Sequence, residues 1–322
     1  MIQLGNRLEM FVDRFLIDQL QGARLELAEP RPAGVALTYE QPWEGPHHGY
    51  TTVFQDGDRF RMYYRASVSE RKGDKGMKDG YEGEFTCYAE SCDGVKWEKP
   101  KLGLYEVLGT KKNNVVLAND PPYSTNFSPF LDGNPACPPG QRYKAVAGMG
   151  SNMACFRKGW LPKSKAGLFG FGAEHWTSRS NKPVLGILQT GPAEISVYVL
   201  RKNGQIGRSM ERMTLRLDGF ASVRAPYDGG EMITKPFTFE GGSLVLNYST
   251  SAAGSLPVEV RGEDGRAIEG FALDDCPEII GDEIERVVTW KNDPDVSKVA
   301  GKNVRLRFLM KDADLYSFRF RG

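Results

Sequence analysis

The sequence predicts an all-β fold, and three observations support this prediction. Short runs of β-branched and aromatic residues recur along the chain, separated by turn pairs such as Asp56-Gly57. The 322 residues include 37 glycines and 19 prolines, which is typical of a fold rich in turns. The pattern between Gly49 and Pro100 also returns twice further along the chain, which indicates a repeated unit of strands.

Composition argues against several kinds of partner. The chain has 42 basic and 41 acidic residues, so we expect no nucleic acid and no anionic membrane as a partner. No apolar run reaches the roughly 20 residues that a membrane span needs. The first residues lack a basic start followed by an apolar core, so we see no signal peptide. This predicts a cytoplasmic protein, or a periplasmic or secreted one if the N-terminus is incomplete.

Cysteine and histidine usage predicts no metal site and no cofactor. The five cysteines have spacings that match no zinc or redox motif, and the chain has only three histidines. Cys87 and Cys92 flank a turn and could face each other across it, but we expect free thiols.

The N-terminal region predicts extended structure with an ambiguous start. Residues 8–20 interleave apolar and acidic side chains, so a short helix and a strand both fit. The next segment, 24–28, alternates and is followed by Pro30 and Pro32, as expected of an edge strand.

The stretch from Gly49 to Pro100 predicts two hairpins in series. The first has its turn at Asp56-Gly57, and the second runs from Glu84 to Trp97 with its turn at Asp93-Gly94. Two consecutive hairpins give four antiparallel strands, which is one blade of a β-propeller. The alternative is an ordinary meander of a sandwich or barrel.

The hairpin pattern recurs downstream. Predicted strands of the two recurrences are Tyr123–Asp132, Arg142–Ala147, Lys182–Gln189, Glu194–Leu200 and a hairpin over Met210–Val223 with its turn at Asp218-Gly219. Between them, residues 151–172 show no alternation and have a basic, glycine-rich composition. That segment neither continues the pattern nor predicts a helix.

Beyond Glu231 the repeat stops and about seven short strands follow, which suggests a β-sandwich of roughly 90 residues. They are 232–239, 243–249, 256–261, 268–272, 284–291, 304–310 and 315–320. We therefore predict a propeller-like domain over 1–230, with an irregular or deleted region at 151–172, and a sandwich domain over 231–322.

The segments 56–64 and 88–97 resemble the five-bladed propellers of glycoside hydrolases in the invertase and arabinanase clans. Over 8–150 and 174–322 the chain is similar to uncharacterised bacterial proteins that join such a propeller to a C-terminal sandwich. The matching segments are Phe11–Asp13, Arg31–Gly34, Asn126–Asp132, Gly230–Pro236, Asp275–Ile279 and Lys311–Tyr316. Five blades of about 45 residues need over 200 residues before the sandwich, so we expect an incomplete propeller that lacks its middle blades. A smaller complete all-β fold is the alternative.

The resemblance implies carbohydrate as the partner and catalytic carboxylates on the inner strands of different blades. The catalytic candidates are Asp13, Glu44 and Glu174. The candidates for substrate binding are His47, His48, Tyr50, Asn126, Ser128, Trp176, Arg179 and Asn181. The segment Ser91–Trp97 resembles the Asp-box turn of sialidases, whose role is structural, so we assign it no chemistry.

The sequence also departs from these hydrolases. Their Asn-Asp-Pro-Asn, Arg-Asp-Pro and Glu-Cys-Pro motifs are absent from the expected places, and Cys276-Pro-Glu278 falls within the predicted sandwich. We therefore expect a glycoside-hydrolase-like protein that acts on or binds poly- or oligosaccharide and has lost activity with its missing blades. The alternative is a non-catalytic carbohydrate-binding or protein-interaction module. The missing motifs favour binding, and the propeller architecture favours hydrolysis. The sequence does not indicate an oligomeric state.

Overall fold

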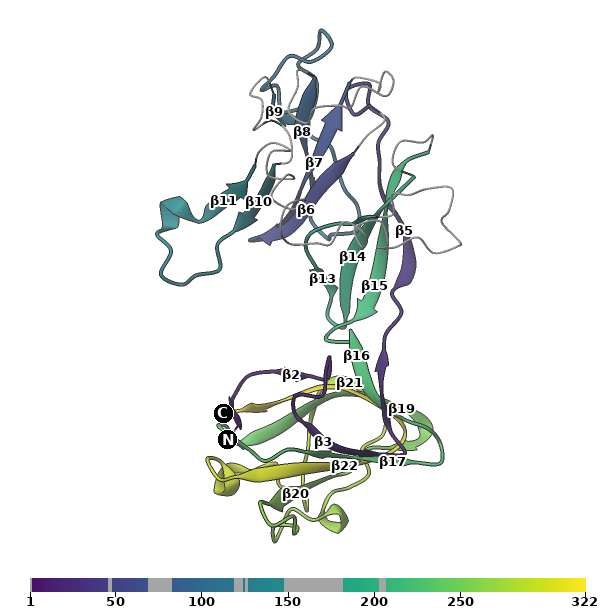
Figure 1. Ribbon diagram of the computed structural model, residues 1–322, viewed down its shortest axis with the longest axis vertical. Helices are drawn as coiled ribbons and strands as arrows, with labels where there is room; N and C mark the ends of the chain where they lie inside the picture. Colours follow the sequence, from purple (N-terminus) through teal and green to yellow (C-terminus); the bar gives the residue numbers. More distant parts are fainter. Residues whose placement is uncertain are drawn as a thin grey trace, which may run out of the picture. The chain divides into compact units, whose positions relative to one another are not determined.

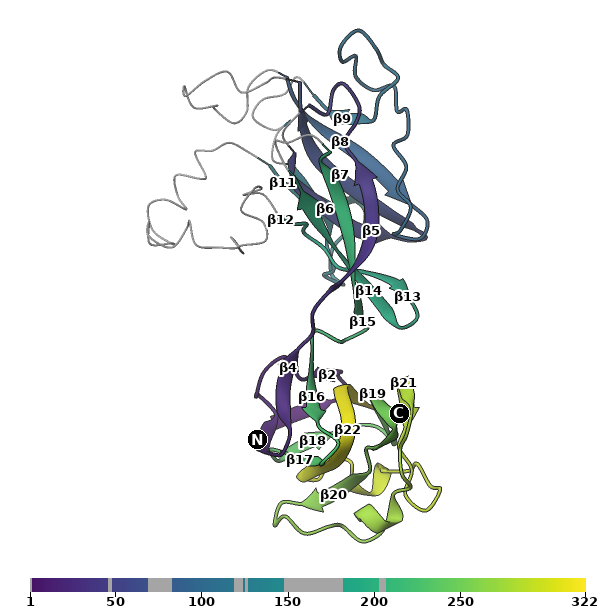
Figure 2. The same ribbon diagram turned by 90° about the vertical axis from the view of Figure 1, so that its right-hand side faces the viewer.

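The computed structural model describes residues 2–45, 48–68, 83–118, 124, 127–147, 182–202 and 207–322. Over these residues the chain consists of strands, turns and a few short 3-10 segments, so the predicted all-β class is confirmed (Figures 1 and 2). No helix in this part of the chain is long and apolar enough to cross a membrane. The chain divides into two compact units, unit 1 with Met1–Glu29 and Leu215–Gly322, and unit 2 with Pro30–Thr214.

Unit 2 contains a four-stranded antiparallel sheet in sequence order. Its strands are β6 (Gly49–Asp56), β7 (Arg59–Ser67), β8 (Glu84–Ser91) and β9 (Val115–Leu117). The first predicted hairpin is confirmed, with Asp56 opposite Arg59. The predicted return strand at 95–97 is wrong, because β9 pairs with β8 instead and residue 98 makes only an isolated bridge to Glu90.

The turn that follows β8 explains this difference. One carboxylate oxygen of Asp93 accepts the backbone N–H groups of Val95 and Lys96, both at 2.8 Å. These bonds hold residues 93–96 in a turn capped by the Asp93 side chain, so residues 95–97 do not form a strand and only Glu98 pairs with Glu90. The indole of Trp97 packs edge-on against Tyr198, with ring centroids 5.9 Å apart. These contacts give the segment Ser91–Trp97 a structural role.

A second sheet of unit 2 has the order β12 (Lys182–Pro183), β14 (Glu194–Arg201), β15 (Ser209–Arg216), β5 (Arg31–Thr38), with β13 (Leu188–Gly191) also paired to β14. Buried side chains of both sheets form one core, among them Met62, Tyr64 and Cys87 from the first sheet and Tyr198, Leu200 and Met210 from the second.

The hairpin predicted around residue 133 is also confirmed as β10 (Ser128–Leu131) paired with β11 (Tyr143–Val146), joined through the 3-10 turn η1 (Pro139–Gln141).

The hairpin predicted over Met210–Val223 is wrong. β15 pairs with β5, whereas β16 (Ala221–Ala225) pairs with β4 (Arg24–Leu27) and β22 (Val304–Arg321). Asp218 has a left-handed φ of 61°, and its carboxylate accepts a hydrogen bond of 3.0 Å from Ser317 of β22. This contact fixes the turn to strands of unit 1, so the two strands on either side of it enter different sheets.

Unit 1 is organised around β22. Besides β4 and β16, its strands are β1 (Ile2–Gly5), β2 (Glu9–Met10), β3 (Ile17–Gln21), β17 (Gly230–Thr234), β18 (Phe237–Phe239), β19 (Ser243–Ser255), β20 (Val258–Gly262) and β21 (Asp282–Val287), with the 3-10 turns η4 (Leu273–Asp275) and η5 (Ser297–Val299). The first part of β22 pairs with β17 and β20, and its last part pairs with β16 and β19. A single strand thus replaces the two predicted at 304–310 and 315–320, and 268–272 forms no strand.

The compact units differ from the predicted boundary at residue 230. β1 runs parallel to β18, and β3 pairs with β17, so the N-terminal segment belongs to unit 1. The physical reason is burial, because Leu4, Phe11 and Ile17 enter the same core as Phe318 of β22.

Candidate functional site

Glu44, a predicted catalytic residue, lies at the centre of a buried polar network in unit 2. Its side chain is completely buried, in the turn before β6. One carboxylate oxygen accepts a hydrogen bond of 2.6 Å from the Tyr64 hydroxyl and lies 2.5 Å from the Lys99 amino group. The other accepts the backbone N–H of Gln41 at 2.8 Å. Both oxygens are therefore occupied by donors from the protein itself.

A second layer of contacts holds the partners of Glu44. The Asn114 amide donates to the Tyr64 hydroxyl at 2.7 Å, and the Trp43 indole donates to the Asn114 oxygen at 2.8 Å. Gly45 has a φ of 59°, and a Cβ there would lie 1.5 Å from the carbonyl oxygen of Ser67, so only glycine fits. This close approach lets the Ser67 N–H donate to the Glu44 carbonyl at 3.2 Å.

Burial controls the ionisation of the neighbouring groups. It raises the pKa of Tyr39, Tyr64 and Cys87, and the Glu44 carboxylate raises each of them further. The two phenols therefore stay protonated, and the Cys87 thiol is not a nucleophile at neutral pH. The network has the properties of a structural ion pair, since a general acid or base must reach its substrate.

The other predicted site residues of unit 2 are dispersed. His48 is buried and its ring stacks on Tyr39, with centroids 3.9 Å apart. Tyr50 is 41% exposed, and the Arg65 guanidinium lies 4.9 Å from the centre of its ring. Ser128 is half-buried at the start of β10. Of these three described candidates, His48 is the one that joins the surroundings of Glu44, through Tyr39.

Asp13, the second catalytic candidate, belongs to unit 1. It lies in an exposed turn, where its carboxylate accepts the backbone N–H of Phe15 at 2.7 Å. The candidates His47, Asn126, Glu174, Trp176, Arg179 and Asn181 fall outside the described residues. Within the described part of the chain, no group of three or more His, Cys, Asp or Glu side chains could hold a metal ion.

A groove of about 420 Å³ lies beside the Glu44 network. It is lined by Val35, Ala36, Leu37, Thr38, Glu40, Gln41, Trp97 and Lys99. The cationic side chain of this groove, Lys99, is already bound by the protein, because its amino group pairs with Glu44 and also donates to the Thr38 carbonyl at 2.6 Å. The Trp97 ring is only 9% exposed, so it offers little stacking surface. The charged side chain of the groove besides Lys99 is the exposed Glu40.

The opposite face of the β6–β8 sheet presents what we call the aromatic–arginine surface. It consists of Phe54, Asp56, Arg59, Arg61, Tyr63, Tyr88 and Glu90 on β6–β8, with Phe127, Arg142 and Tyr143 from the neighbouring β10–β11 hairpin region. These strand positions alternate with the core residues Met62, Tyr64 and Ala89, so they share the face turned away from the core. On this face Tyr88 is itself buried, with an exposed fraction of 5%.

A chain of hydrogen bonds orders the polar groups of this surface. The Arg61 guanidinium donates to Asp56 at 2.6 Å and to the Tyr88 hydroxyl at 2.9 Å. Tyr88 in turn donates to Glu90 at 3.0 Å. The Tyr143 hydroxyl donates to Asp56 at 2.9 Å, while its side chain remains 63% exposed. The surface therefore holds an exposed aromatic ring in a fixed position.

Further aromatic rings lie beside this chain. Tyr63 stacks with Phe54 at 5.9 Å and contacts Tyr88 at 5.1 Å and Phe127 at 6.3 Å between ring centroids. Burial opposes ionisation of Asp56, but the hydrogen bonds from Arg61 and Tyr143 outweigh it and lower its pKa. Burial raises the pKa of Tyr88 to about 12, so this hydroxyl remains a donor.

The segments 56–64 and 88–97, which carry the family resemblance, contribute residues to the aromatic–arginine surface, but none of its residues is among the site candidates predicted from the sequence. The sequence feature that could have indicated this surface is the alternation within β7, where Arg59, Arg61 and Tyr63 interleave with apolar core residues. An outward face that carries aromatic rings, instead of small polar side chains only, indicates an interaction surface.

The β10–β11 hairpin is expected to loosen in acid. A hydrogen bond from Lys144, helped by the backbone N–H of Asn134, lowers the pKa of Asp132 from 3.8 to about 2. Because this folded-state pKa lies below the unfolded value, Asp132 contributes stability that is present above pH 3.8 and is lost as the pH falls through 2. Amide exchange should therefore be slower in wild type than in Asp132→Asn at neutral pH, with the difference gone at the acid end. A difference that is the same at all pH values would contradict this assignment.

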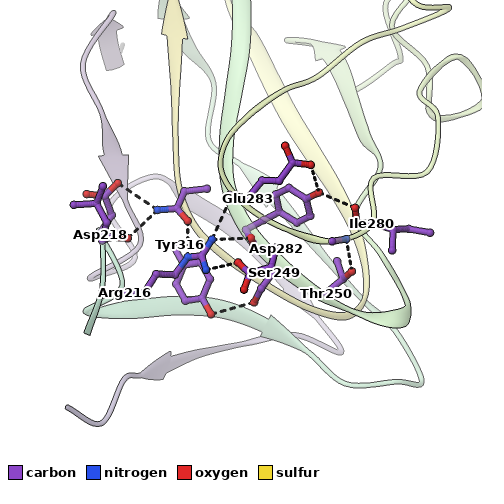
Figure 3. A network of polar contacts seen from close by, with 12 residues as sticks. Arg216, Asp218, Ser249, Thr250, Ile280, Asp282, Glu283 and Tyr316 are labelled. Atoms are coloured by element: carbon purple, nitrogen blue, oxygen red, sulfur yellow. Dashed lines mark hydrogen bonds and ion pairs between the residues drawn. The ribbon is translucent and has the colours of Figure 1, made fainter. Parts of the chain in front are cut away.

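Unit 1 has a polar network of its own around Arg216 (Figure 3). Its guanidinium donates to the Asn247 side chain at 2.7 Å and to the carbonyls of Tyr248 and Glu283 at 3.0 and 3.1 Å. It also pairs with Asp282 and lies 4.7 Å from the centre of the Tyr316 ring. These contacts hold the turn after β15 onto β19 and β21, so we assign this network a structural role.

Comparison of the chain with protein-family models, with curated proteins and with solved structures finds no match.

Proposed function

We propose that this protein binds carbohydrate without cleaving it, through the aromatic–arginine surface. The observation that supports this best is the exposed ring of Tyr143, which Asp56 holds beside Arg61. A sugar ring has an apolar face of C–H groups and a rim of hydroxyls. An aromatic ring matches the apolar face, and carboxylate and guanidinium groups accept from and donate to the hydroxyls.

We expect no cleavage because of the environments of the candidate carboxylates. Glycoside hydrolysis needs two carboxyl groups, roughly 5 to 10 Å apart across the scissile bond, and one of them must have a raised pKa to act as the acid. Glu44 is buried and paired with Lys99, and the Asp13 carboxylate accepts the backbone N–H of Phe15 in an exposed turn. On the aromatic–arginine surface the pKa of Asp56 is lowered, which is opposite to the need of a general acid.

The test is binding of the full chain to a glycan array, followed by calorimetry with the strongest ligand. We expect Tyr143→Ala to lower the affinity about tenfold, as removal of an aromatic anchor does in other interfaces. Tyr227→Ala is the matched control, because Tyr227 is a tyrosine of unit 1 that is 60% exposed. Equal affinities of Tyr143→Ala and wild type, or no binding to any glycan, would contradict the proposal. Release of reducing ends from the bound glycan would show a hydrolase instead.

A further inference from the structure

We propose that the glycan recognised by the aromatic–arginine surface is acidic and bears carboxylate or sulfate groups, an inference that rests on the proposed function. The Arg61 guanidinium binds Asp56, the charge of Arg142 also acts on Asp56, and Arg59 lies opposite Asp56 in the strand register with its guanidinium near Glu90. Two carboxylates, Asp56 and Glu90, belong to the same surface. Three guanidinium groups against two carboxylates leave one positive charge in excess on this surface.

The three arginines differ in how strongly other side chains of the protein already bind their guanidinium groups. Arg61 is bound on two sides by Asp56 and Tyr88. Arg59 is 47% exposed, and its nearest nitrogen is 3.8 Å from Glu90, which is too long for a hydrogen bond. Arg142 is exposed, and its charge acts on Asp56, whose pKa is lowered. Arg59 and Arg142 are thus the two groups that an incoming anion can engage.

Guanidinium groups suit this ligand chemistry. Arginine binds carboxylate and sulfate-like oxyanions through paired hydrogen bonds, and such charge-assisted bonds are stronger than neutral ones. With Tyr143 fixed beside them, a sugar that stacks on this ring would place an acidic substituent near Arg59 or Arg142. Single-stranded nucleic acid also combines aromatic stacking with cations. We favour glycan, because nucleic-acid sites track a backbone with a continuous basic groove, whereas here two carboxylates interrupt the arginines.

The experiment compares matched polymers that differ only in charge. Binding of the full chain is measured by affinity electrophoresis and calorimetry with polygalacturonate and its fully methyl-esterified form, and with a sulfated galactan and its desulfated form. We expect the acidic member of at least one pair to bind about tenfold more tightly, the range of one or two charge-assisted hydrogen bonds. Arg59→Gln and Arg142→Gln should each reduce this preference, and added salt should reduce it as well. Arg266→Gln is the control, since Arg266 of unit 1 has an 88% exposed side chain.

The outcomes separate two claims, that the surface binds carbohydrate and that this carbohydrate is acidic. Equal binding of the acidic and neutral members of both pairs would overturn the acidic class and leave carbohydrate binding intact. Binding to none of the four polymers and to no glycan on an array would overturn both. Tighter binding of a single-stranded oligonucleotide, weakened by the same two arginine variants, would also overturn the inference and assign the surface to nucleic acid.

Discussion

Replacement of Lys99 by methionine is expected to lower the free energy of unfolding of unit 2 by about 3 kcal/mol. The Lys99 amino group lies 2.5 Å from the Glu44 carboxylate, and the exposed fractions of the two side chains are 16% and 0%. Methionine fills much of the lysine volume but removes the charge. The Glu44 carboxylate then remains buried with only the neutral donors Tyr64 and Gln41. An uncompensated buried charge is among the most destabilising single changes in a protein.

Native-state hydrogen exchange of the full chain measures this effect locally. Peptides from β6–β8 should exchange faster in Lys99→Met, while peptides from β19 and β22 of unit 1 should be unchanged. Lys101→Met is the matched control, because Lys101 is exposed two residues further on. Adding Glu44→Gln to Lys99→Met should restore part of the lost stability, since it removes the carboxylate charge that Lys99 no longer balances. Unchanged exchange in Lys99→Met would mean that the ion pair does not stabilise the unit.

Replacement of Phe318 by alanine is expected to destabilise unit 1 by about 4 kcal/mol. Phe318 is 1% exposed on β22. Its ring contacts those of Phe11, Phe237, Phe308 and Phe320, with centroids 5.9 to 6.2 Å apart. These rings come from both ends of the chain, and strand neighbours on β22 cannot collapse far enough to fill the cavity.

The measurement is again hydrogen exchange, followed in peptides of β1–β3 and β17–β22. Leu309→Ala serves as the control on the same strand, because Leu309 is 42% exposed. Faster exchange in Phe318→Ala should include the N-terminal strands, which pack into the same core. If β1 and β3 kept their protection while β22 lost it, the N-terminal segment would not share a cooperative core with the C-terminal strands.

Local features of the fold could be predicted from the sequence. The β6–β7 hairpin follows from Asp56-Gly57 between two alternating runs, and the β10–β11 hairpin follows from the runs around Gly133. These contacts join residues close in the chain, so their signals are contained in a short window. A turn at Asp93-Gly94 was also predicted from its local sequence, but the return strand predicted at 95–97 does not form.

Long-range pairings could not be predicted in this way. Nothing near Ile2 indicates that it lies opposite Phe237, and nothing near Asp218 indicates that Ser317 binds its carboxylate. Such contacts depend on which apolar faces find each other after the chain has closed large loops. Asp218-Gly219 therefore had the local signal of a hairpin turn but connects strands of different sheets.

In the candidate site, too, local features could be predicted from the sequence and long-range contacts could not. Glu44 was selected as a polar residue before a strand, but its burial and its pairing with Lys99, 55 positions later in the sequence, are tertiary facts. The aromatic–arginine surface combines β6–β8 with residues of the β10–β11 hairpin region. Its strand residues had a readable alternation, whereas the contact of Tyr143 with Asp56 required the structure.

A crystal structure of the full chain with an acidic oligosaccharide, such as a short oligogalacturonide, tests the central claim most directly. We expect a sugar ring stacked on Tyr143, with hydroxyls at Asp56 or Arg61 and an acidic group at Arg59 or Arg142. A sugar bound in the groove beside Lys99 or on unit 1, with Tyr143 left bare, would contradict it.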